Sequence, residues 1–487
     1  MDIFELTRGQ LAGAPYSESS SLQLTAEINS LTDAQVYPRS LVPYSDSIYC
    51  LVRKGQNKLL AVINRQSESS DLIVALHPKS VDTLSLLRER LPWLNPMPWG
   101  THMTAGCGDR LGLATPGHLH ALRLMQSKYP QKQMAPILAQ QSIREMARTN
   151  RSPQSVMDDA AWGVFQEGWS SGFGSDADHL KTTDDIDVCV AAGFTFFTFD
   201  PGAHVVNTYT SDEYATLPWG ELETTSSDVM SRYAARYDQE TIQRAFVKYG
   251  KAIVHVARLY RHLKSRMGDS PFEVEVSVDE TDQPTTHAEH AIIASELRRL
   301  DVVWVSLAPR FVGRFEKGVD YIGDLLRFSA DCAGHAQIAR EWGPYKLSIH
   351  SGSDKFSIYP IVAQYAGQLV HLKTAGTSYL EALRTVAGTD QQLFRDIYAL
   401  ACSRYAEDRK SYHVSADPSR APSASTRSQD LPGILDQFDA RQMLHVCFGS
   451  ILASFGESIK TVLLNNEAMH YADLQTHFVR HLECFCR

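Results

Sequence analysis

The most unusual chemical pattern in the sequence lies in residues 272–280, which read Phe-Glu-Val-Glu-Val-Ser-Val-Asp-Glu. If this segment is a strand, alternation places its valines on one face and Glu273, Glu275, Ser277 and Asp279 on the other. A carboxylate that points into a protein interior needs a metal ion, a cation or a proton to offset the cost of its desolvation. The segment therefore predicts a strand whose acidic face lines a reactive site, with a solvated edge strand as the alternative.

Two histidines stand at the ends of other short apolar runs. His179 follows the run 172–178, and His350 ends the run 346–350. Imidazole nitrogens and carboxylate oxygens together suit divalent ions such as Zn, Mn, Co or Ni. A single histidine in such a place is more often a hydrogen-bonded core or loop residue. Ligands on different strands can converge on a barrel axis, however, so we expect a divalent metal ion near these two histidines.

Four basic side chains fall near the same run ends: Lys181, Arg310, Lys355 and Lys373. The chain as a whole is acidic, with 47 Lys and Arg against 56 Asp and Glu and a net charge of -9. Cations gathered on one face of an acidic protein favour an anionic substrate, such as a sugar acid or a sugar phosphate. Surface salt bridges are the alternative. The overall charge argues against a nucleic acid as the partner.

Eight short apolar runs, most of them followed by a helical stretch, must position these residues: 110–115, 135–140, 172–178, 194–200, 272–279, 302–308, 346–350 and 369–374. Eight such units predict a (β/α)8 TIM-like barrel, an α/β fold whose reactive groups lie at the carboxyl ends of the strands. Apolar residues at helical spacing predict a long helix within an insertion at about 205–268. A doubly wound open sheet is the competing architecture, but no G-x-G-x-x-G motif follows the first run.

We expect three parts along the chain: a small N-terminal α+β lead-in (1–105), the catalytic barrel (106–378) and C-terminal helices packed on the barrel (379–487). Residues 411–430, rich in Ser, Pro and Arg, predict a surface loop or linker. The eight cysteines are scattered, the first residues lack the apolar core of a signal peptide, and no run is long enough to span a membrane. These features predict a cytoplasmic protein with no membrane partner, and they leave a homo-oligomer open.

Three segments carry a resemblance to a known family: residues 108–118 (GDRLGLATPGH), 174–181 (GSDADHLK) and 349–356 (IHSGSDKF). They resemble those of the tagaturonate/fructuronate epimerases, and the likeness runs from about residue 100 to the end of the chain. The resemblance implies a metal-dependent epimerase that interconverts the uronates D-tagaturonate and D-fructuronate in bacterial hexuronate catabolism.

The resemblance also implies roles for single residues. Asp178 looks like the proton acceptor, and Glu275 resembles the proton donor. Metal ligands are implied at His179, at His350 and in the loop after the sixth strand, where we assign Glu316 and hold Asp320 as nearly as suitable.

The implied reaction restricts the mechanism. The inverted carbon lies two bonds from the ketone carbon, so the carbonyl does not acidify its C–H bond. A retro-aldol path avoids this difficulty, with a divalent ion holding the enediolate oxygens and carboxylates moving the hydroxyl proton. Transient oxidation would need a bound nicotinamide. A class II aldolase or an epimerase of another ketose or sugar phosphate is the nearest alternative function, and a non-catalytic sugar-acid-binding barrel is the second.

Overall fold

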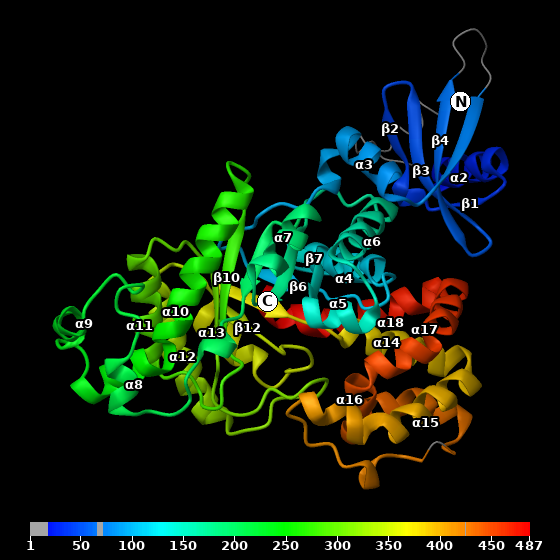
Figure 1. Cartoon of the computed structure of the whole chain (residues 1–487). Helices are drawn as coiled ribbons and strands as arrows, with labels where there is room; N and C mark the ends of the chain where they lie inside the picture. The colour runs from blue at the N-terminus through cyan, green and yellow to red at the C-terminus, as the bar shows by residue number, and fades with distance from the viewer. Residues whose placement is uncertain (1–17, 66–71, 424) are drawn as a thin grey trace.

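The structure, a computed structural model, describes residues 18–65, 72–423 and 425–487. Residues 1–17, on which the expectation of no signal peptide rests, lie outside the described residues. The centre of the molecule is a closed barrel of parallel strands in the order β10-β11-β12-β13-β6-β7-β8-β9 (Figure 1). Its eight strands are β6 (Thr104–Gly106), β7 (Ala135–Ser142), β8 (Gly174–Leu180), β9 (Phe196–Phe199), β10 (Glu273–Val278), β11 (Ser306–Pro309), β12 (Lys346–Ile349) and β13 (Val370–Lys373). The predicted TIM-like barrel is confirmed.

Seven of the eight predicted strands overlap an observed one, but the first prediction is wrong. Residues 110–115 form a turn and the start of a helix, whereas the first barrel strand is β6. The Asp109 carboxylate accepts hydrogen bonds from the backbone N–H groups of Leu111, Gly112 and Ala114 at 2.7–3.0 Å, and Gly112 has a φ of 77°. These bonds hold the segment in a turn, because they take the N–H groups that a strand would pair.

The acidic face of β10 points into the barrel, as its alternation predicts. All six residues of β10 are buried, and Val274, Val276 and Val278 belong to the main hydrophobic core. The Glu275 carboxylate lies 2.9 Å from the ammonium of Lys373 on β13. Because β10 and β13 are not neighbours in the barrel, this contact crosses its interior.

Helices surround the barrel and fill the insertion between β9 and β10. The helices that follow the strands up to β12 are α4 (Thr115–Lys128), α5 (Ile143–Thr149), α6 (Pro153–Gln166), α7 (Thr183–Ala191), α11 (His287–Arg299), α12 (Leu325–Glu341) and α13 (Tyr359–Ala366). The insertion holds α8 (Ser211–Ala215), α9 (Ser226–Tyr233) and the long α10 (Gln239–Met267). The predicted long helix is therefore present, and its buried face packs on α7 and α11.

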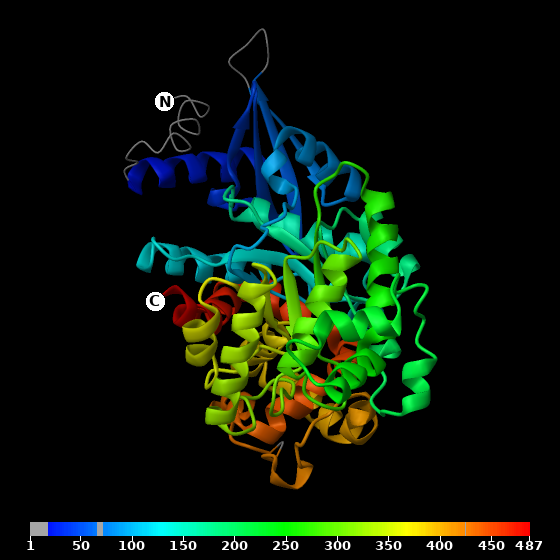
Figure 2. The ribbon, with the colours of Figure 1, turned by 90° about the vertical axis from the view of Figure 1, so that its left-hand side faces the viewer.

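An antiparallel sheet precedes the barrel and lies above it in the view of Figure 2. Its strands are β1 (Gln35–Val36), β2 (Val42–Tyr44), β3 (Ser47–Lys54), β4 (Asn57–Arg65) and β5 (Leu72–Pro78). One face of the sheet packs toward the barrel, because Tyr49, Leu51 and Leu60 belong to the main hydrophobic core. Helix α2 (Glu18–Thr32) lies on the other face through Leu24 and Ile28, and α3 (Val81–Arg90) leads on towards the barrel. No residue of this sheet lines the cavity described below.

Helices at the C-terminal end pack against the barrel. They are α14 (Thr377–Thr389), α15 (Gln391–Asp408), α16 (Phe438–Val446), α17 (Phe448–Asn465) and α18 (Glu467–Cys486). Helix α18 lies so close to α4 that a Cβ atom on Gly117 would come within 2.6 Å of Leu474. Among the described residues no single helix is long and apolar enough to cross a membrane, although α16 and α17, bent by 78°, pass that test together.

Buried charges join these C-terminal helices to the loop after β12. The Asp354 carboxylate in that loop lies 2.9 Å from Arg441 of α16 and 2.6 Å from His477 of α18. Arg441 also lies 3.3 Å from Glu381 of α14. All four residues are buried, so the loop after β12 is fixed by partners that come from beyond the barrel strands.

Candidate active site

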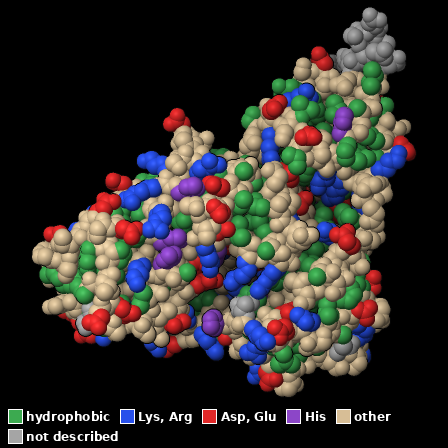
Figure 3. All heavy atoms as spheres, in the orientation of Figure 1, with side chains coloured by type: hydrophobic (Ala, Val, Ile, Leu, Met, Phe, Trp, Pro, Cys, Tyr) green, Lys and Arg blue, Asp and Glu red, His purple; other side chains and the backbone are tan. Residues whose placement is uncertain are grey.

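A cavity of about 530 Å³ opens at the carboxyl ends of the barrel strands. Its size is within the usual range for a small-molecule site. The surface is hollowed between the insertion and the C-terminal helices, and Lys, Arg, Asp, Glu and His side chains gather around the hollow (Figure 3). Seven of the residues that line the cavity carry most of the argument below: Asp178, His179, Asp279, Arg310, Lys317, His350 and Lys373.

Asp178 and His179 enter the cavity from the end of β8. The pairing of β8 with β9 shifts register here, and His179 has a φ of 56°, a left-handed conformation that few residues other than glycine adopt. The His179 ring lies with Nδ1 2.8 Å from Asp178 Oδ1. A hydrogen bond from Nδ1–H to this carboxylate leaves the Nε2 lone pair of His179 free to bind a ligand.

Lys373, at the end of β13, is surrounded by carboxylates. Its Nζ atom lies 2.8 Å from Asp176, 2.6 Å from Asp178 and 2.9 Å from Glu275 Oε1, and it donates to Thr198 at 2.7 Å. Burial alone would lower the pKa of Lys373, but the three carboxylates hold it well above its ordinary value. Lys373 is therefore a buried ammonium that links two carboxylates of the site.

The two linked carboxylates are ionised for the same reason. Burial works to raise the pKa of Asp178, but the charges of His179 and Lys373 outweigh it and hold that pKa well below its ordinary value. Burial is likewise outweighed at Glu275 by Lys373 and His350, which hold its pKa well below the usual range. Both groups can thus accept a proton at neutral pH.

His350 follows β12 and lies between two carboxylates. Its Nε2 is 2.6 Å from Glu275 Oε1, and its Nδ1 is 3.2 Å from Asp279 Oδ1. Burial lowers the pKa of His350, but Asp279 and Glu275 outweigh it and raise the pKa to about 10. Without a metal ion, the ring is therefore protonated on both nitrogens at neutral pH. A metal ion at Nδ1 would replace the proton there, while Nε2–H keeps donating to Glu275, the arrangement that orients a metal-binding histidine.

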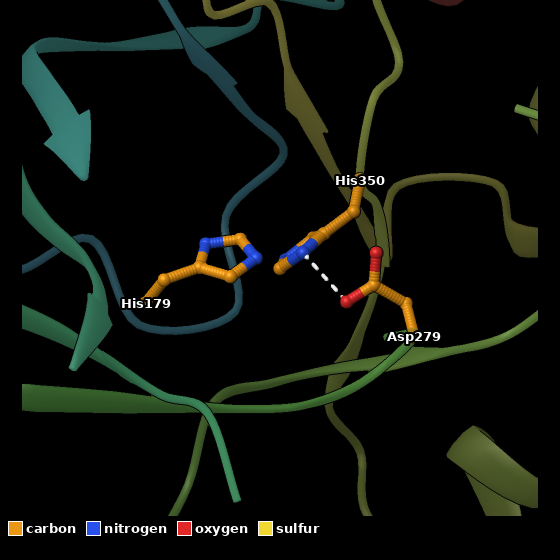
Figure 4. A group of neighbouring side chains, drawn as sticks. All are labelled: His179, Asp279 and His350. Atoms are coloured by element: carbon orange, nitrogen blue, oxygen red, sulfur yellow. Dashed lines mark ion pairs between the residues drawn. The ribbon is translucent and has the colours of Figure 1, made fainter. Parts of the chain in front are cut away.

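His179, Asp279 and His350 form the group in this cavity best suited to a metal ion. One ligand atom from each lies within 4.8 Å of the others. Figure 4 shows the two imidazole rings pointing toward each other, with Asp279 beside His350, and the ring centroids are 5.0 Å apart. Two nitrogens and one oxygen form a donor set that suits a borderline divalent ion, with positions left for water or substrate. These residues therefore fit the expected metal.

Glu316 and Asp320, the expected further ligands, lie elsewhere. Glu316 lines the cavity, but its Oε2 atom accepts hydrogen bonds from Ser415 at 2.7 Å and 2.8 Å and from Gln442 at 3.1 Å. Asp320 accepts hydrogen bonds from Ser357. The structure does not bring either carboxylate into the group with His179 and His350.

Two of the four expected substrate-binding cations also lie outside the cavity lining. Lys355 is fully buried, and its Nζ atom donates to the carbonyl oxygens of Glu316, Val319 and Ser353 at 2.5–3.0 Å. It therefore ties the loop after β11 to the loop after β12. Lys181 lies 3.0 Å from Asp200 and does not line the cavity.

Arg310 and Lys317 line the cavity and form no ion pair within the described residues. Neither has a carboxylate within 4.0 Å in the part of the chain that the structure describes. Lys317 donates to Ser351 at 2.7 Å. Arg310 was expected from the sequence, whereas Lys317 was missed because it lies seven residues beyond it in a loop, where no periodicity places a side chain.

Three other functional candidates were also missed. Asp279 was seen on the acidic face of the fifth strand but was not assigned as a ligand, although its alternation with Glu275 was the available signal. Tyr412 and His413 line the cavity from the segment 411–430, which the sequence marks only as a surface loop or linker. Nothing in its composition points toward the barrel.

Comparisons with known proteins identify the family of this chain. The family model for UxaE, described as tagaturonate epimerase, matches residues 37–485. The chain belongs to the tagaturonate epimerase family. It is 38% identical over 472 residues to the tagaturonate/fructuronate epimerase of Thermotoga maritima, which covers 92% of this chain and 96% of that protein.

Solved structures support the same family. The crystal structure of the fructuronate-tagaturonate epimerase UxaE from Cohnella laeviribosi with one glycerol has a TM-score of 0.84 and 34% identity, and covers 95% of this chain and 99% of that one. The native form of that enzyme gives the same four values. As a member of the tagaturonate epimerase family, the protein is an isomerase, and the predicted enzyme class is confirmed. The alternative of a non-catalytic sugar-acid-binding barrel gains no support from these relatives.

Proposed function

We propose that this epimerase interconverts D-tagaturonate and D-fructuronate with a divalent metal ion at the barrel mouth. The observation that carries the proposal is the Lys373 ammonium, 2.6 Å from Asp178 Oδ1 and 2.9 Å from Glu275 Oε1. Two carboxylates joined by one cation can move a hydroxyl proton without net change in charge. A place in hexuronate catabolism in the cytoplasm, with the free uronate as substrate, is part of this proposal.

The proposed chemistry is retro-aldol cleavage and re-addition. Asp178 takes the proton of the C4 hydroxyl, the C3–C4 bond breaks, and its electrons pass into the enediolate at C2 and C3. The aldehyde rotates, the C3–C4 bond re-forms on its other face, and Glu275 delivers a proton to the new alkoxide. A bound divalent ion supplies Lewis-acid stabilisation of the enediolate charge.

Lys373 restores the protonation of the two carboxylates in this scheme. Glu275 is ionised in the resting site, so it must receive a proton before it can give one. Lys373 contacts both carboxylates and can pass one proton to Glu275 while it takes one from Asp178. Glu275 is fully buried and does not line the cavity, but its Oε2 atom has no hydrogen-bond partner among the described residues. We propose that this atom meets the hydroxyl of the bound substrate.

We assign the metal to His179, Asp279 and His350 in place of the set that included Glu316. Each histidine has its other ring nitrogen close to a proposed proton carrier, His179 to Asp178 at 2.8 Å and His350 to Glu275 at 2.6 Å. Carboxylates in this position orient metal-binding imidazoles and raise their basicity. The donor set leaves the choice among Zn, Mn, Co and Ni open.

We assign the substrate carboxylate to Arg310 and Lys317 in place of Lys355 and Lys373. Arg310 can form a paired, charge-assisted contact with a carboxylate, and Lys317 adds a second positive charge. Lys373 already has three carboxylate neighbours, so a further anion gains little there.

The reaction itself is tested with the purified protein and D-tagaturonate in deuterated water, followed by NMR with and without added metal after chelation. We expect fructuronate only with metal, and retention of hydrogen at the inverted carbon. Deuterium at that carbon would rule out retro-aldol chemistry. Retention with no trappable three-carbon fragment would instead favour a bound redox cofactor.

The carboxylate site is tested with Arg310→Gln. We expect KM for the uronate to rise about 10-fold to 100-fold, with a much smaller change for the matching neutral ketose. Lys181→Gln is the matched control, since Lys181 is paired with Asp200 outside the cavity lining. Equal losses on both sugars would contradict the assignment of Arg310.

A further inference from the structure

A second group of two histidines and an aspartate lies outside the cavity, between α11 and α12. His287 is the first residue of α11, and Asp331 and His335 lie one turn apart on α12. One ligand atom from each falls within 4.8 Å of the others. None of these three residues lines the cavity at the barrel mouth.

The distances in this group fit a shared ion better than hydrogen bonds. Asp331 Oδ1 lies 3.5 Å from His287 Nε2 and 3.5 Å from His335 Nε2. Both separations exceed the usual range for an N–H···O hydrogen bond. Tetrahedral ligands at about 2.0–2.1 Å from a zinc ion are separated by about 3.3–3.4 Å, so the two separations from Asp331 are close to the required spacing. The two histidine nitrogens lie within 4.8 Å of each other.

The buried histidine of the group has a nitrogen that lacks a partner. His335 is fully buried, and its Nε2 atom has no hydrogen-bond partner among the described residues. Its Nδ1 lies 2.9 Å from His290 Nδ1, and His290 Nε2 lies 2.8 Å from the Tyr345 hydroxyl. Only one hydrogen can lie between the two Nδ1 atoms. If His335 carries it, its Nε2 presents a lone pair to the group, as in a ligand oriented by a second histidine.

His287, the exposed histidine of the group, packs its ring directly against the backbone of Gly334. A Cβ atom on Gly334 would come within 2.2 Å of Cε1 and 2.3 Å of Nε2 of His287, so the ring holds this place only because residue 334 is glycine. The His287 side chain is 48% exposed, which gives an ion a path from solvent. Its Nε2 now lies 3.1 Å from the Asp331 carbonyl oxygen, and an exposed ring can change tautomer at small cost.

We propose that His287, Asp331 and His335 bind a second divalent ion, of the zinc, cobalt or nickel class, with water as the fourth ligand. The ion joins α11 to α12. It also fixes the loop after β11, because Asp331 Oδ2 accepts a hydrogen bond from the Val312 N–H at 3.0 Å. The neighbours of Val312, Phe311 and Gly313, line the cavity. The site is structural and takes no part in the epimerisation.

The experiment counts bound Zn²⁺ by equilibrium dialysis and elemental analysis in the whole chain. We expect two ions in the wild type and one each in His287→Ala and Gly334→Ala, with epimerase activity kept in both. Gly334→Ala keeps all three ligands and only displaces the His287 ring. The matched control is His262→Ala, since His262 also lies 2.8 Å from an aspartate, Asp187, but has no third ligand near it among the described residues.

The His350→Ala variant separates this proposal from the proposed function. One ion that survives His350→Ala and disappears in His287→Ala supports the second site even if the mouth binds none. An ion count that His287→Ala leaves unchanged overturns the second site, whatever the mouth binds. If Gly334→Ala does not fold, His287→Ala alone decides, because the His287 side chain is 48% exposed and its truncation leaves the buried His335 in place.

Discussion

His350 at the barrel mouth and His118 and His470 between α4 and α18 are all buried, yet their pKa values shift in opposite directions. At the mouth, Asp279 and Glu275 raise the pKa of His350 to about 10. Between the helices, burial lowers the pKa of His118 and of His470 to about 4, and no carboxylate lies within 4.0 Å of either ring among the described residues. The His118 Nε2 atom instead lies 2.7 Å from the Ser378 hydroxyl, and its ring packs on Phe478. For these three histidines, a hydrogen-bonded carboxylate rather than depth of burial decides the direction of the pKa shift.

The largest expected effect is on activity at the mouth. His350→Ala should lower kcat/KM at least about 10⁴-fold and remove the bound ion, because the loss of one ligand forfeits several kcal/mol of stabilisation. His118→Gln, at the helix interface, should keep activity within about threefold. Metal content is read by elemental analysis and activity by NMR. A His350→Ala protein that retains both full metal and full activity would contradict the proposed site.

The next effect tests the role of the carboxylate directly. Asp178→Asn should reduce epimerisation about 10²-fold to 10⁴-fold, since the hydroxyl proton loses its acceptor. The same substitution should lower the pKa of His179, as burial lowers those of His118 and His470, because the Asp178 charge that opposes burial is gone. NMR titration of the metal-free protein should show the pKa of His179 falling from above to below its ordinary value. An unchanged His179 pKa would mean that another group sets its charge.

The interface histidines predict a loss of stability in acid. Their folded pKa of about 4 lies below the unfolded value of about 6.5, so the unfolded chain binds more protons between these values. Stability is present above pH 6.5 and is lost as the pH falls towards 4. Each ring accounts for up to about 3 kcal/mol. Urea unfolding at pH 7 and pH 4.5 should therefore show a smaller acid loss in His118→Gln than in the wild type, and equal losses would refute the assignment.

The smallest effect concerns the packing that encloses those histidines. Gly117→Ala places a Cβ atom 2.6 Å from Leu474 and should lower the free energy of unfolding by about 1–3 kcal/mol. Gly456→Ala in α17 is the matched control, because a Cβ atom there meets nothing within 4 Å, and it should be neutral or slightly stabilising. Both are measured by urea unfolding. The pKa of His350 should stay unchanged in each variant.

Periodicity made much of this fold predictable. The alternation of Glu, Val and Ser at 272–279 identified β10 and the face that enters the barrel, and the apolar spacing in the insertion identified α10. The first strand could not be found in the same way, because β6 has only the three residues Thr104–Gly106 and no alternation to read. The segment 110–115 has alternating apolar residues, Leu111 and Leu113, and so resembles a strand. These leucines are apolar because they pack against the C-terminal helices, not because they lie in the barrel sheet.

Side-chain direction limited what could be said of the site. Lys355 and Lys373 both stand near strand ends, but only Lys373 lies on a strand, where alternation decides the side to which it points. Lys355 lies in a loop, and its contact with three carbonyl oxygens depends on loop shapes that no local pattern encodes. The placement of Glu316 was out of reach for the same reason, because its partners Ser415 and Gln442 come from about a hundred residues further along the chain.

The buried charges around Asp354 restrict how relatives of this enzyme can exchange parts. A chimera that took its barrel from one relative and its last hundred residues from another would inherit Asp354 from one parent and Arg441 and His477 from the other. If a single partner differed, a charge would stay buried without its counterion, at a cost of about 3–5 kcal/mol. Viable crossovers should therefore keep these residues together as one inherited block, wherever the boundary falls in the sequence.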